Sequence, residues 1–202
     1  ILFLDIAGGE DLSKIQFRKH PHDIAFDGKT MKDYAEFLGL SPTLENGIDL
    51  LLELEIKGGF FGIFHAMSEG DIERFIVNPD IMFDSDGDLL TFGLGHPHPR
   101  CYGTFPKIIG TYVRERKLLP LEEVIRRMTS LPAQKIGLKD IGLIKEGALS
   151  DIVIFDFEKI NDLSTYTDPH HFPIGIEQVI INGEFVIKDQ ALTGNKPGRW
   201  LK

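Results

Sequence analysis

Two aspartates follow a short apolar run, in the segment Asp84-Ser85-Asp86-Gly87. The run 81–83 predicts a short buried strand, and in a βα barrel the carboxyl end of each strand faces the active site. A carboxylate in that place can bind a metal or move a proton. An Asx-type turn that closes a strand explains the same residues, and on spacing alone it is the simpler explanation, since Asp-x-Asp-Gly turns are common.

A second group of polar side chains lies in the Pro-rich segment from Gly95 to Pro106, which contains two histidines, Arg100 and Tyr102. The three prolines predict a stiff loop that holds such side chains in place. An arginine in such a loop can bind a carboxylate through two parallel hydrogen bonds. A rigid surface loop with an incidental arginine fits the composition equally well.

Four of the histidines form two His-x-His pairs, His20-Pro21-His22 and His96-Pro97-His98. This spacing can bind zinc at the end of a strand. However, a zinc site needs two further ligands, and a central proline disfavours a paired strand. Neither pair follows a long apolar strand. We therefore expect both pairs to be structural.

The other histidines and the cysteine also favour structural roles. His170 and His171 are adjacent, so in an extended chain they point to opposite faces and chelate poorly. His65 ends an apolar run and is placed to face an active site, but a lone histidine is more often packed or hydrogen-bonded. Cys101 is the only cysteine, which excludes an internal disulfide and a Cys-rich zinc site. We expect it to be a reduced or shielded thiol.

The elements that must position these residues change in character near residue 140. Before that point, apolar runs predict strands at 1–6, 14–17, 60–64 and 81–83, and helical spacing predicts helices at 30–38, 41–55, 68–77, 105–115 and 121–130. This alternation predicts parallel βα units, three of them over residues 1–130, too few to close an eight-stranded barrel. After it, we predict a strand at 151–155 and a hairpin at 178–187 that turns at Asn182-Gly183, because Asn-Gly favours the required positive φ angles.

The predicted helix ends carry recognisable signals. Ser41 can cap the helix at 41–55, with Pro42 in the first helical position, and Gly58-Gly59 can end it. Ser68-Glu69-Gly70-Asp71 resembles a capping box at the start of the next helix.

Composition and charge exclude several classes of function. The chain has 202 residues, 42% of them hydrophobic, and a net charge of −9. An acidic surface repels phosphate backbones, so we expect no nucleic-acid partner. The sequence has no apolar run long enough to span a bilayer and no signal peptide, so we expect no membrane association and a cytoplasmic location. The first residue is not Met, which suggests a start inside a longer protein.

An ordered series of motifs resembles a known family. Its members are Ser85-Asp86-Gly87, His98-Pro99-Arg100-x-Tyr102-Gly103-Thr104-Phe105-Pro106, Leu121-Glu122-Glu123, Met128-Thr129-Ser130-Leu131-Pro132-Ala133, Ser150-Asp151-Ile-Val-Ile-Phe-Asp156, Pro169-His170, Val179-Ile-Ile-Asn-Gly183 and Thr193-Gly194-x-x-Pro197-Gly198-Arg199. Over residues 65–202 this series is similar to the C-terminal half of the N-acyl-D-amino-acid deacylases, or D-aminoacylases, of the amidohydrolase superfamily.

The resemblance implies an α/β fold in two parts. Residues 1–140 would form the last strands and helices of a (β/α)8 TIM-like barrel of the metal-dependent hydrolase type. Residues 141–202 would form the C-terminal strands of a small β-sandwich domain. The resemblance also implies a zinc-dependent hydrolase of the amide bond of N-acyl-D-amino acids, with a small-molecule substrate.

The resemblance implies a role for three residues. Asp86, rather than Asp84, matches the family's catalytic carboxylate, which takes a proton from a zinc-bound water and returns it to the departing amine; Asp86 is also a possible zinc ligand. Arg100 matches the residue that grips the substrate carboxylate, and Tyr102 is a second candidate for substrate binding. The family's other zinc ligands have no match here, so we expect this chain alone to lack a complete metal site and to be inactive.

Two alternatives stay open at this point. One is a cyclic amide hydrolase of the dihydroorotase or hydantoinase kind, against which the His98-Pro-Arg100 and Thr104-Phe-Pro106 motifs argue. The other is a truncated, non-catalytic module. Since a partial barrel leaves apolar faces uncovered, we also expect a homodimer through those faces.

Overall fold

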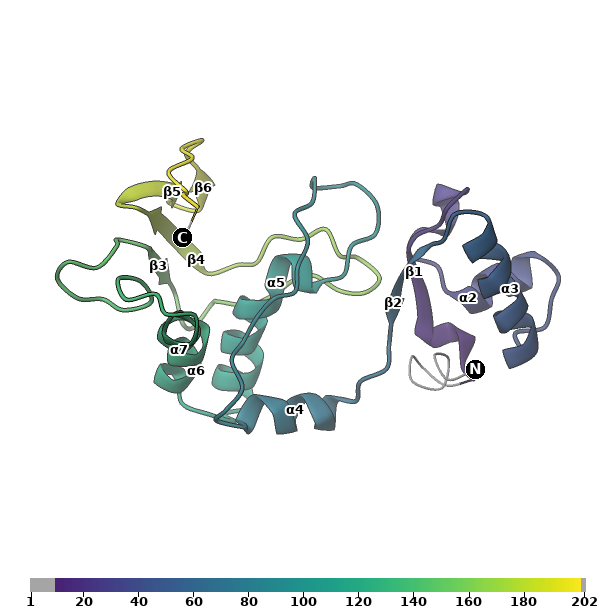
Figure 1. Cartoon of the computed structure of the whole chain (residues 1–202), viewed down its shortest axis with the longest axis horizontal. Coiled ribbons are helices and arrows are strands. Elements are labelled where there is room, and N and C mark those ends of the chain that lie inside the picture. Colours follow the sequence, from purple (N-terminus) through teal and green to yellow (C-terminus); the bar gives the residue numbers. More distant parts are fainter. Residues whose placement is uncertain (1–9, 201–202) are drawn as a thin grey trace. The chain divides into compact units, whose positions relative to one another are not determined.

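The computed structural model describes residues 10–200, which divide into two compact units (Figure 1). Unit 1 contains the described residues up to Ile72 together with Gly87–Cys101 and Thr165–His170. Unit 2 contains Glu73–Asp86, Tyr102–Ser164 and the described residues from His171 onward. The strand expected at 1–6 lies outside the described residues.

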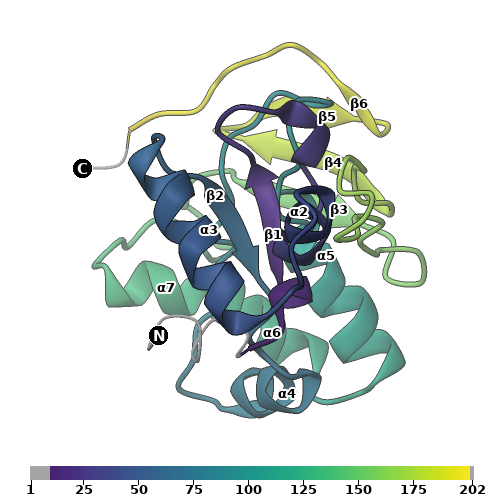
Figure 2. The ribbon, with the colours of Figure 1, turned by 90° about the vertical axis from the view of Figure 1, so that its right-hand side faces the viewer.

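Unit 1 is built on two short strands and two helices. The strands β1 (Ile15–Lys19) and β2 (Phe61–Phe64) form one ladder, and α2 (Met31–Phe37) and α3 (Leu44–Ile56) pack on it (Figure 2). Single 3₁₀ turns η1 (Leu12–Lys14) and η2 (Ile24–Phe26) flank β1. The buried core of this unit consists of Leu12, Ile15, Phe17, Phe26, Met31, Ala35, Leu50 and Leu54.

The pairing of β1 and β2 corrects one prediction. The two strands run antiparallel, with Ile15 opposite Phe64, whereas strand–helix alternation predicted parallel βα units. The prediction failed because the chain between the strands contains two helices and turns back within unit 1, which returns β2 alongside β1 in the opposite sense. Alternation alone does not distinguish these two topologies.

The helices of unit 1 begin where their capping residues allow. The helix predicted from residue 30 begins at Met31, because Thr30 caps it in a capping box with Asp33. Thr43, rather than the predicted Ser41, caps α3: its hydroxyl accepts a hydrogen bond from the Asn46 N–H. The helix therefore begins at Leu44, and Ser41 contributes only its backbone carbonyl, which accepts a hydrogen bond from the Asn46 side chain.

The expected strand at 81–83 is absent from the described structure, where these residues have no regular conformation. A strand needs a neighbour with which to exchange backbone hydrogen bonds. Instead, the Ile81 N–H donates a hydrogen bond to the Asn78 carbonyl at 3.3 Å, and the Phe83 N–H donates one to the Arg127 carbonyl at the end of a helix at 3.2 Å. The segment is thus an irregular connection that follows α4 (Glu69–Val77).

A group of helices follows, which belongs to unit 2 except for its first two residues, Arg100 and Cys101. The helix α5 (Arg100–Lys107) continues into a π-helical stretch, η3 (Ile108–Glu115), and is followed by α6 (Leu121–Met128) and α7 (Ser130–Lys135). The π-helical stretch begins soon after Pro106, which cannot donate a backbone hydrogen bond. The prediction that this helix starts at Phe105, after a stiff loop, was wrong, because Arg100 already occupies its first turn.

The C-terminal part of unit 2 is a four-stranded antiparallel sheet in the order β3-β4-β5-β6. Its strands are β3 (Ile152–Phe155), β4 (Ile176–Ile181), β5 (Glu184–Lys188) and β6 (Ala191–Leu192). The predicted hairpin is confirmed: Asn182 and Gly183 have φ angles of 49° and 82°. A second two-residue turn, Asp189-Gln190 with φ angles of 51° and 65°, leads into β6. It contains no Gly, so the sequence did not predict it.

Among the helices of the described chain, none combines the length and the apolar character that crossing a bilayer requires.

Candidate functional site

The segment that leads to Asp86 is held by one buried arginine of α6. Arg127 is 1% exposed, and its guanidinium donates hydrogen bonds to the Ile76 carbonyl (2.7 Å) and the Ile81 carbonyl (2.6 Å). Its guanidinium carbon lies 4.2 Å from the ring centroid of Phe83. These contacts fix both ends of residues 76–83, directly before the two aspartates. Burial lowers the pKa of Arg127.

The turn at Asp84-Ser85-Asp86 has an unusual backbone. The Asp84 carboxylate accepts a hydrogen bond from the N–H of the next residue, Ser85, at 2.7 Å, whereas the Asx-type turn that the spacing favoured is defined by a bond to the residue two positions on. Asp86 has a φ angle of 44°, in the left-handed region that non-glycine residues adopt at some energetic cost. Residues held in this region often mark functional sites. Asp84 and Asp86 therefore differ: the Asp84 carboxylate is bonded to the next backbone N–H, and Asp86 has the left-handed backbone.

Arg100 stands at the start of α5, and His98 fixes the backbone there. The Nδ1 atom of His98 accepts a hydrogen bond from the Arg100 N–H at 3.0 Å, and the His98 carbonyl accepts one from the Cys101 N–H at 3.0 Å. The imidazole thus satisfies a backbone N–H at the beginning of α5, as a capping side chain does. The His-Pro-Arg motif is therefore a helix start, and Arg100 itself is exposed.

Tyr102 lies on α5 as well, two residues after Arg100. Its ring meets the edge of the Phe172 ring at a centroid distance of 5.8 Å. Residues at positions i and i+2 of a helix do not face each other. Arg100 and Tyr102 therefore project from different sides of α5.

A polar cluster in unit 1 joins strand β1 to the segment Thr165–His170. Gln16 is 4% exposed, and its side-chain amide donates hydrogen bonds to the Gly28 carbonyl (2.9 Å) and the Tyr166 carbonyl (2.8 Å). The Nε2 atom of His96 lies 2.7 Å from the same Tyr166 carbonyl. The Nε2 atom of His65 lies 3.1 Å from Gln16 Oε1.

These partners determine which ring nitrogen carries hydrogen. Because the Gln16 NH₂ group donates to two carbonyls, its oxygen faces His65, so His65 must donate from Nε2. His96 also donates from Nε2, since a carbonyl can only accept. His98 accepts at Nδ1, so in its neutral form its hydrogen is on Nε2. Burial lowers the pKa of His65, which favours the neutral ring.

The cluster also fixes the loop before α5. The Nδ1 atom of His170 accepts a hydrogen bond from the Gly93 N–H (3.2 Å), and its Nε2–H donates to the Gly95 carbonyl (2.9 Å). His170 is thus structural, as its sequence position predicted. Gly28 permits the close approach of His96, since a Cβ on Gly28 would lie 2.6 Å from the imidazole Nδ1.

The two His-Pro-His pairs are structural in the described chain. His20 is 6% exposed, and its Nδ1 accepts hydrogen bonds from the backbone N–H groups of His22 and Asp23. His20, His22 and His96 line an open pocket of about 500 Å³ in unit 1. Even so, nowhere in residues 10–200 do three His, Cys, Asp or Glu side chains come together as a metal site.

The predicted site residues belong to both compact units. Arg100 belongs to unit 1, while Asp86 and Tyr102 belong to unit 2, and each is described with its own unit. Sequence reasoning singled out His65, which does lie in a polar cluster, but missed Gln16 and Tyr166. No local sequence pattern marks either residue, because Gln16 lies in a five-residue strand and its partner Tyr166 lies 150 residues later in the chain.

Comparison with known proteins places these elements in a family. Residues 84–187 match the Amidohydrolase family. The chain is 40% identical over 140 residues to an N-acyl-D-glutamate deacylase and 37% identical over 156 residues to a D-aminoacylase, both from Alcaligenes xylosoxydans xylosoxydans. These matches cover 69% and 76% of this chain, but only 28% and 30% of the relatives, so the chain spans under a third of their length.

Solved structures agree with the sequence comparison. One is a D-aminoacylase studied for its binuclear metal centre, with a TM-score of 0.81 and 30% identity over 95% of this chain and 37% of that one. Another is an N-acyl-D-glutamate deacylase from Bordetella bronchiseptica complexed with zinc and a phosphonate mimic of the tetrahedral intermediate, with a TM-score of 0.74 and 31% identity over 87% of this chain and 35% of that one. The expected resemblance and the α/β content are thereby confirmed, and the chain belongs to the Amidohydrolase family.

Proposed function

We propose that this chain is the C-terminal part of a zinc-dependent hydrolase that cleaves the amide bond of N-acyl-D-amino acids. One observation carries the proposal: relatives at 37–40% identity over most of the chain are deacylases of this kind. The shorter matches to dihydroorotases cover under a third of the chain. A deacylase therefore accounts for more of the sequence than a cyclic amide hydrolase does.

The fold proposal follows the same relatives. Residues 1–140 supply the last strands and helices of a (β/α)8 barrel, whose strands are parallel, with the antiparallel β1–β2 ladder as an addition to them, and residues 141–202 supply strands of a small β-sandwich domain. The irregular segment 81–83 supports this: its backbone lacks a strand partner in the described chain, and a preceding barrel strand would provide one.

Zinc is the proposed cofactor of the complete polypeptide, by which we mean the longer protein that contains this chain. The described residues do not form a site for it, because they bring no three candidate ligand side chains together. We therefore place the ligand set outside residues 10–200, with Asp86 as one possible addition from this chain. A bound zinc ion would polarise the amide carbonyl or activate water.

The residues of this chain have separate tasks in the proposed reaction. Asp86 holds and returns the proton that the leaving amine requires, a task that a positioned carboxylate performs. Arg100 pairs with the substrate α-carboxylate through its fork of N–H donors. Tyr102 is the second proposed substrate-binding residue; its ring contacts Phe172 and projects from another side of α5 than Arg100 does. The partner is a small molecule.

The adjacent aspartates allow a matched test. The complete polypeptide should hydrolyse N-acetyl-D-amino acids and leave the L-enantiomers intact. Asp86→Asn should lower kcat by at least about 100-fold, because it removes the proton acceptor. Asp84→Asn should retain most of the activity, since its side-chain oxygen can still accept the Ser85 N–H. Equal losses in both variants, or no D-selective hydrolysis by the wild type, would contradict the proposal.

A further inference from the structure

Tyr166 lies in an irregular segment, yet hydrogen bonds fix its backbone carbonyl and two histidine rings contact its side chain. Its carbonyl accepts hydrogen bonds from Gln16 and from His96, at 2.8 and 2.7 Å. Its ring meets the His65 ring at a centroid distance of 4.5 Å and the His98 ring at 5.1 Å, both in edge-on geometry. The residue is nevertheless 41% exposed. The side chain is therefore held in place and still accessible to a ligand.

The hydroxyl of Tyr166 is oriented by His98. The Nε2 atom of His98 lies 3.4 Å from the hydroxyl oxygen, and Nδ1 of the same ring already accepts the Arg100 N–H. The neutral imidazole therefore carries its hydrogen on Nε2 and donates it to the Tyr166 oxygen. The hydroxyl consequently accepts from His98 and keeps its own hydrogen for another acceptor.

The charges around Tyr166 favour an anionic acceptor that pairs with Arg100. Burial, with a contribution from Glu69, raises the pKa of Tyr166, while the nearby Arg100 cation lowers it, and the net effect is a rise. The phenol therefore stays protonated and able to donate at neutral pH. Arg100 and Tyr166 both belong to unit 1, and the same His98 ring contacts the Arg100 N–H and the Tyr166 hydroxyl, so a carboxylate bound by Arg100 has this hydroxyl in its neighbourhood.

We propose that the Tyr166 hydroxyl is a further substrate-binding group, which donates a hydrogen bond to the carboxylate that Arg100 grips. The proposal rests on the deacylase function proposed above and adds a residue to it. His98 links the two donors, because one ring caps the Arg100 backbone and orients the Tyr166 hydroxyl. Gln16, His65 and His96 hold Tyr166 in place and are positioning residues.

The test removes the hydroxyl alone, in the complete polypeptide loaded with zinc. Tyr166→Phe keeps the ring contacts with His65 and His98. Two compounds are compared: the N-acetyl-D-amino acid that the wild type hydrolyses fastest, and its α-carboxamide, assayed as a substrate or as a competitive inhibitor. Tyr34→Phe is the matched control, since Tyr34 packs through its ring against Phe17 and Phe26 in the core of the same unit.

We expect Tyr166→Phe to raise KM for the carboxylate substrate by about 10- to 100-fold, because a hydrogen bond to a charged group is lost. The KM or inhibition constant of the carboxamide should change by less than about 3-fold, which also shows that the variant is folded. Equal effects on both compounds, or an unchanged KM for the carboxylate, would overturn the assignment of Tyr166. A wild type that hydrolyses neither compound would instead refute the proposed function itself.

Discussion

His20 is an imidazole kept neutral inside unit 1. The rings of Phe17, Phe26 and Tyr34 surround it, and its Nδ1 accepts backbone N–H groups. Burial lowers the pKa of His20 below its ordinary value of 6.5, an effect larger than those of Asp23, which raises it, and of its other neighbours. Charging this ring in the folded state therefore costs free energy.

The sign of the resulting pH dependence follows from linkage. As the pH falls through 6.5, the unfolded chain takes up the His20 proton before the folded chain does, so the free energy of unfolding decreases. His20→Asn keeps an acceptor near the position of Nδ1 but cannot be protonated. We expect it to reduce the stability difference between about pH 7.5 and about pH 5.5, measured by urea unfolding and circular dichroism.

The pH experiment needs an allowance for a second histidine, His65, and a control variant at His22. Burial also lowers the pKa of His65, so part of the pH dependence should remain in His20→Asn. His22→Asn is the control, because it changes an exposed histidine of the same turn. A pH dependence that His20→Asn leaves unchanged, or one that only His22→Asn reduces, would show that His20 is not the group concerned.

Among the individual residues of the candidate site, the sequence predicts some and misses others. Asp86 and Arg100 stand in short motifs, so a local pattern can single them out. Tyr166 and Gln16 meet only because the chain folds back over 150 positions, and their importance lies in hydrogen bonds to backbone groups. A pattern of residue types along the chain carries no information on such contacts.

Among the elements, α6 is the one that positions Asp86. Arg127 donates hydrogen bonds to two carbonyls of the segment that precedes Asp86, those of Ile81 and Ile76. Arg127→Met removes these donors and leaves buried carbonyls behind. We expect it to lower the free energy of unfolding by about 2–4 kcal/mol and to lower kcat with it. Urea unfolding and steady-state kinetics of the complete polypeptide measure the two effects.

The neighbouring arginine provides the control. Arg126 forms an exposed pair with Glu123 on the same helix, at 2.8 Å. Arg126→Met should cost less than about 0.5 kcal/mol, since exposed pairs three residues apart contribute little. If the two variants had equal effects, Arg127 would have no special part in holding the segment before Asp86.

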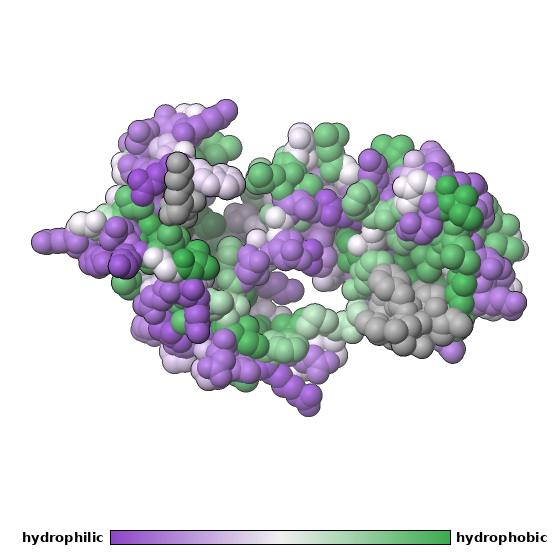
Figure 3. Space-filling view, viewed as in Figure 1, coloured by the Kyte–Doolittle hydropathy of each residue, from purple (hydrophilic) through white to green (hydrophobic). Residues whose placement is uncertain are grey.

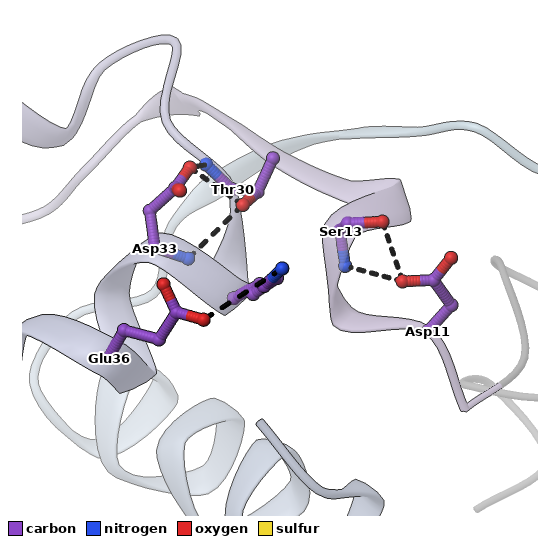
Figure 4. A network of polar contacts seen from close by, with 6 residues as sticks. Asp11, Ser13, Thr30, Asp33 and Glu36 are labelled. Carbon is purple, nitrogen blue, oxygen red and sulfur yellow. Dashed lines mark hydrogen bonds and ion pairs between the residues drawn. The ribbon is translucent and has the colours of Figure 1, made fainter. Parts of the chain in front are cut away.

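The start of α2 is held by a reciprocal pair of hydrogen bonds (Figure 4). The Asp33 N–H donates to the Thr30 hydroxyl oxygen at 3.2 Å, and the Asp33 carboxylate accepts from the Thr30 N–H at 2.7 Å. Thr30→Ala removes the capping oxygen and should lower the free energy of unfolding by about 1 kcal/mol. Thr30→Ser keeps the oxygen and should restore most of it. Urea unfolding would refute this role if alanine and serine behaved alike.

Local signals predict the elements better than their ends or partners. The Asn182-Gly183 hairpin was predictable because two residues determine its φ angles. The start of α3 was misplaced because Ser41 and Thr43 are both good caps, and only the fold selects between them. The start of α5 was misplaced because His98 caps it, and histidine is not a usual capping residue. The sense of the β1–β2 pairing depends on contacts distant in sequence.

For the molecule as a whole, apolar surface remains exposed on each unit, as the green areas of Figure 3 indicate. In unit 1, Ile24, Ile56 and Leu89 are more than four-fifths exposed, and in unit 2 Ile144 and Trp200 are as well. Such surface favours association. We expect the 202-residue chain, expressed alone, to form dimers or larger species as its concentration rises in analytical ultracentrifugation. A monomer at all concentrations would refute this.

The zinc content of two purified proteins, the 202-residue chain and the complete polypeptide, tests the central claim most directly. We expect stoichiometric zinc and deacylase activity in the complete polypeptide, and neither in the chain alone, because its described residues bring no metal-binding cluster together. Stoichiometric zinc in the isolated chain would contradict the account. The metal site would then have to be rebuilt from its own histidines, beginning with His20, His22, His96 and His98.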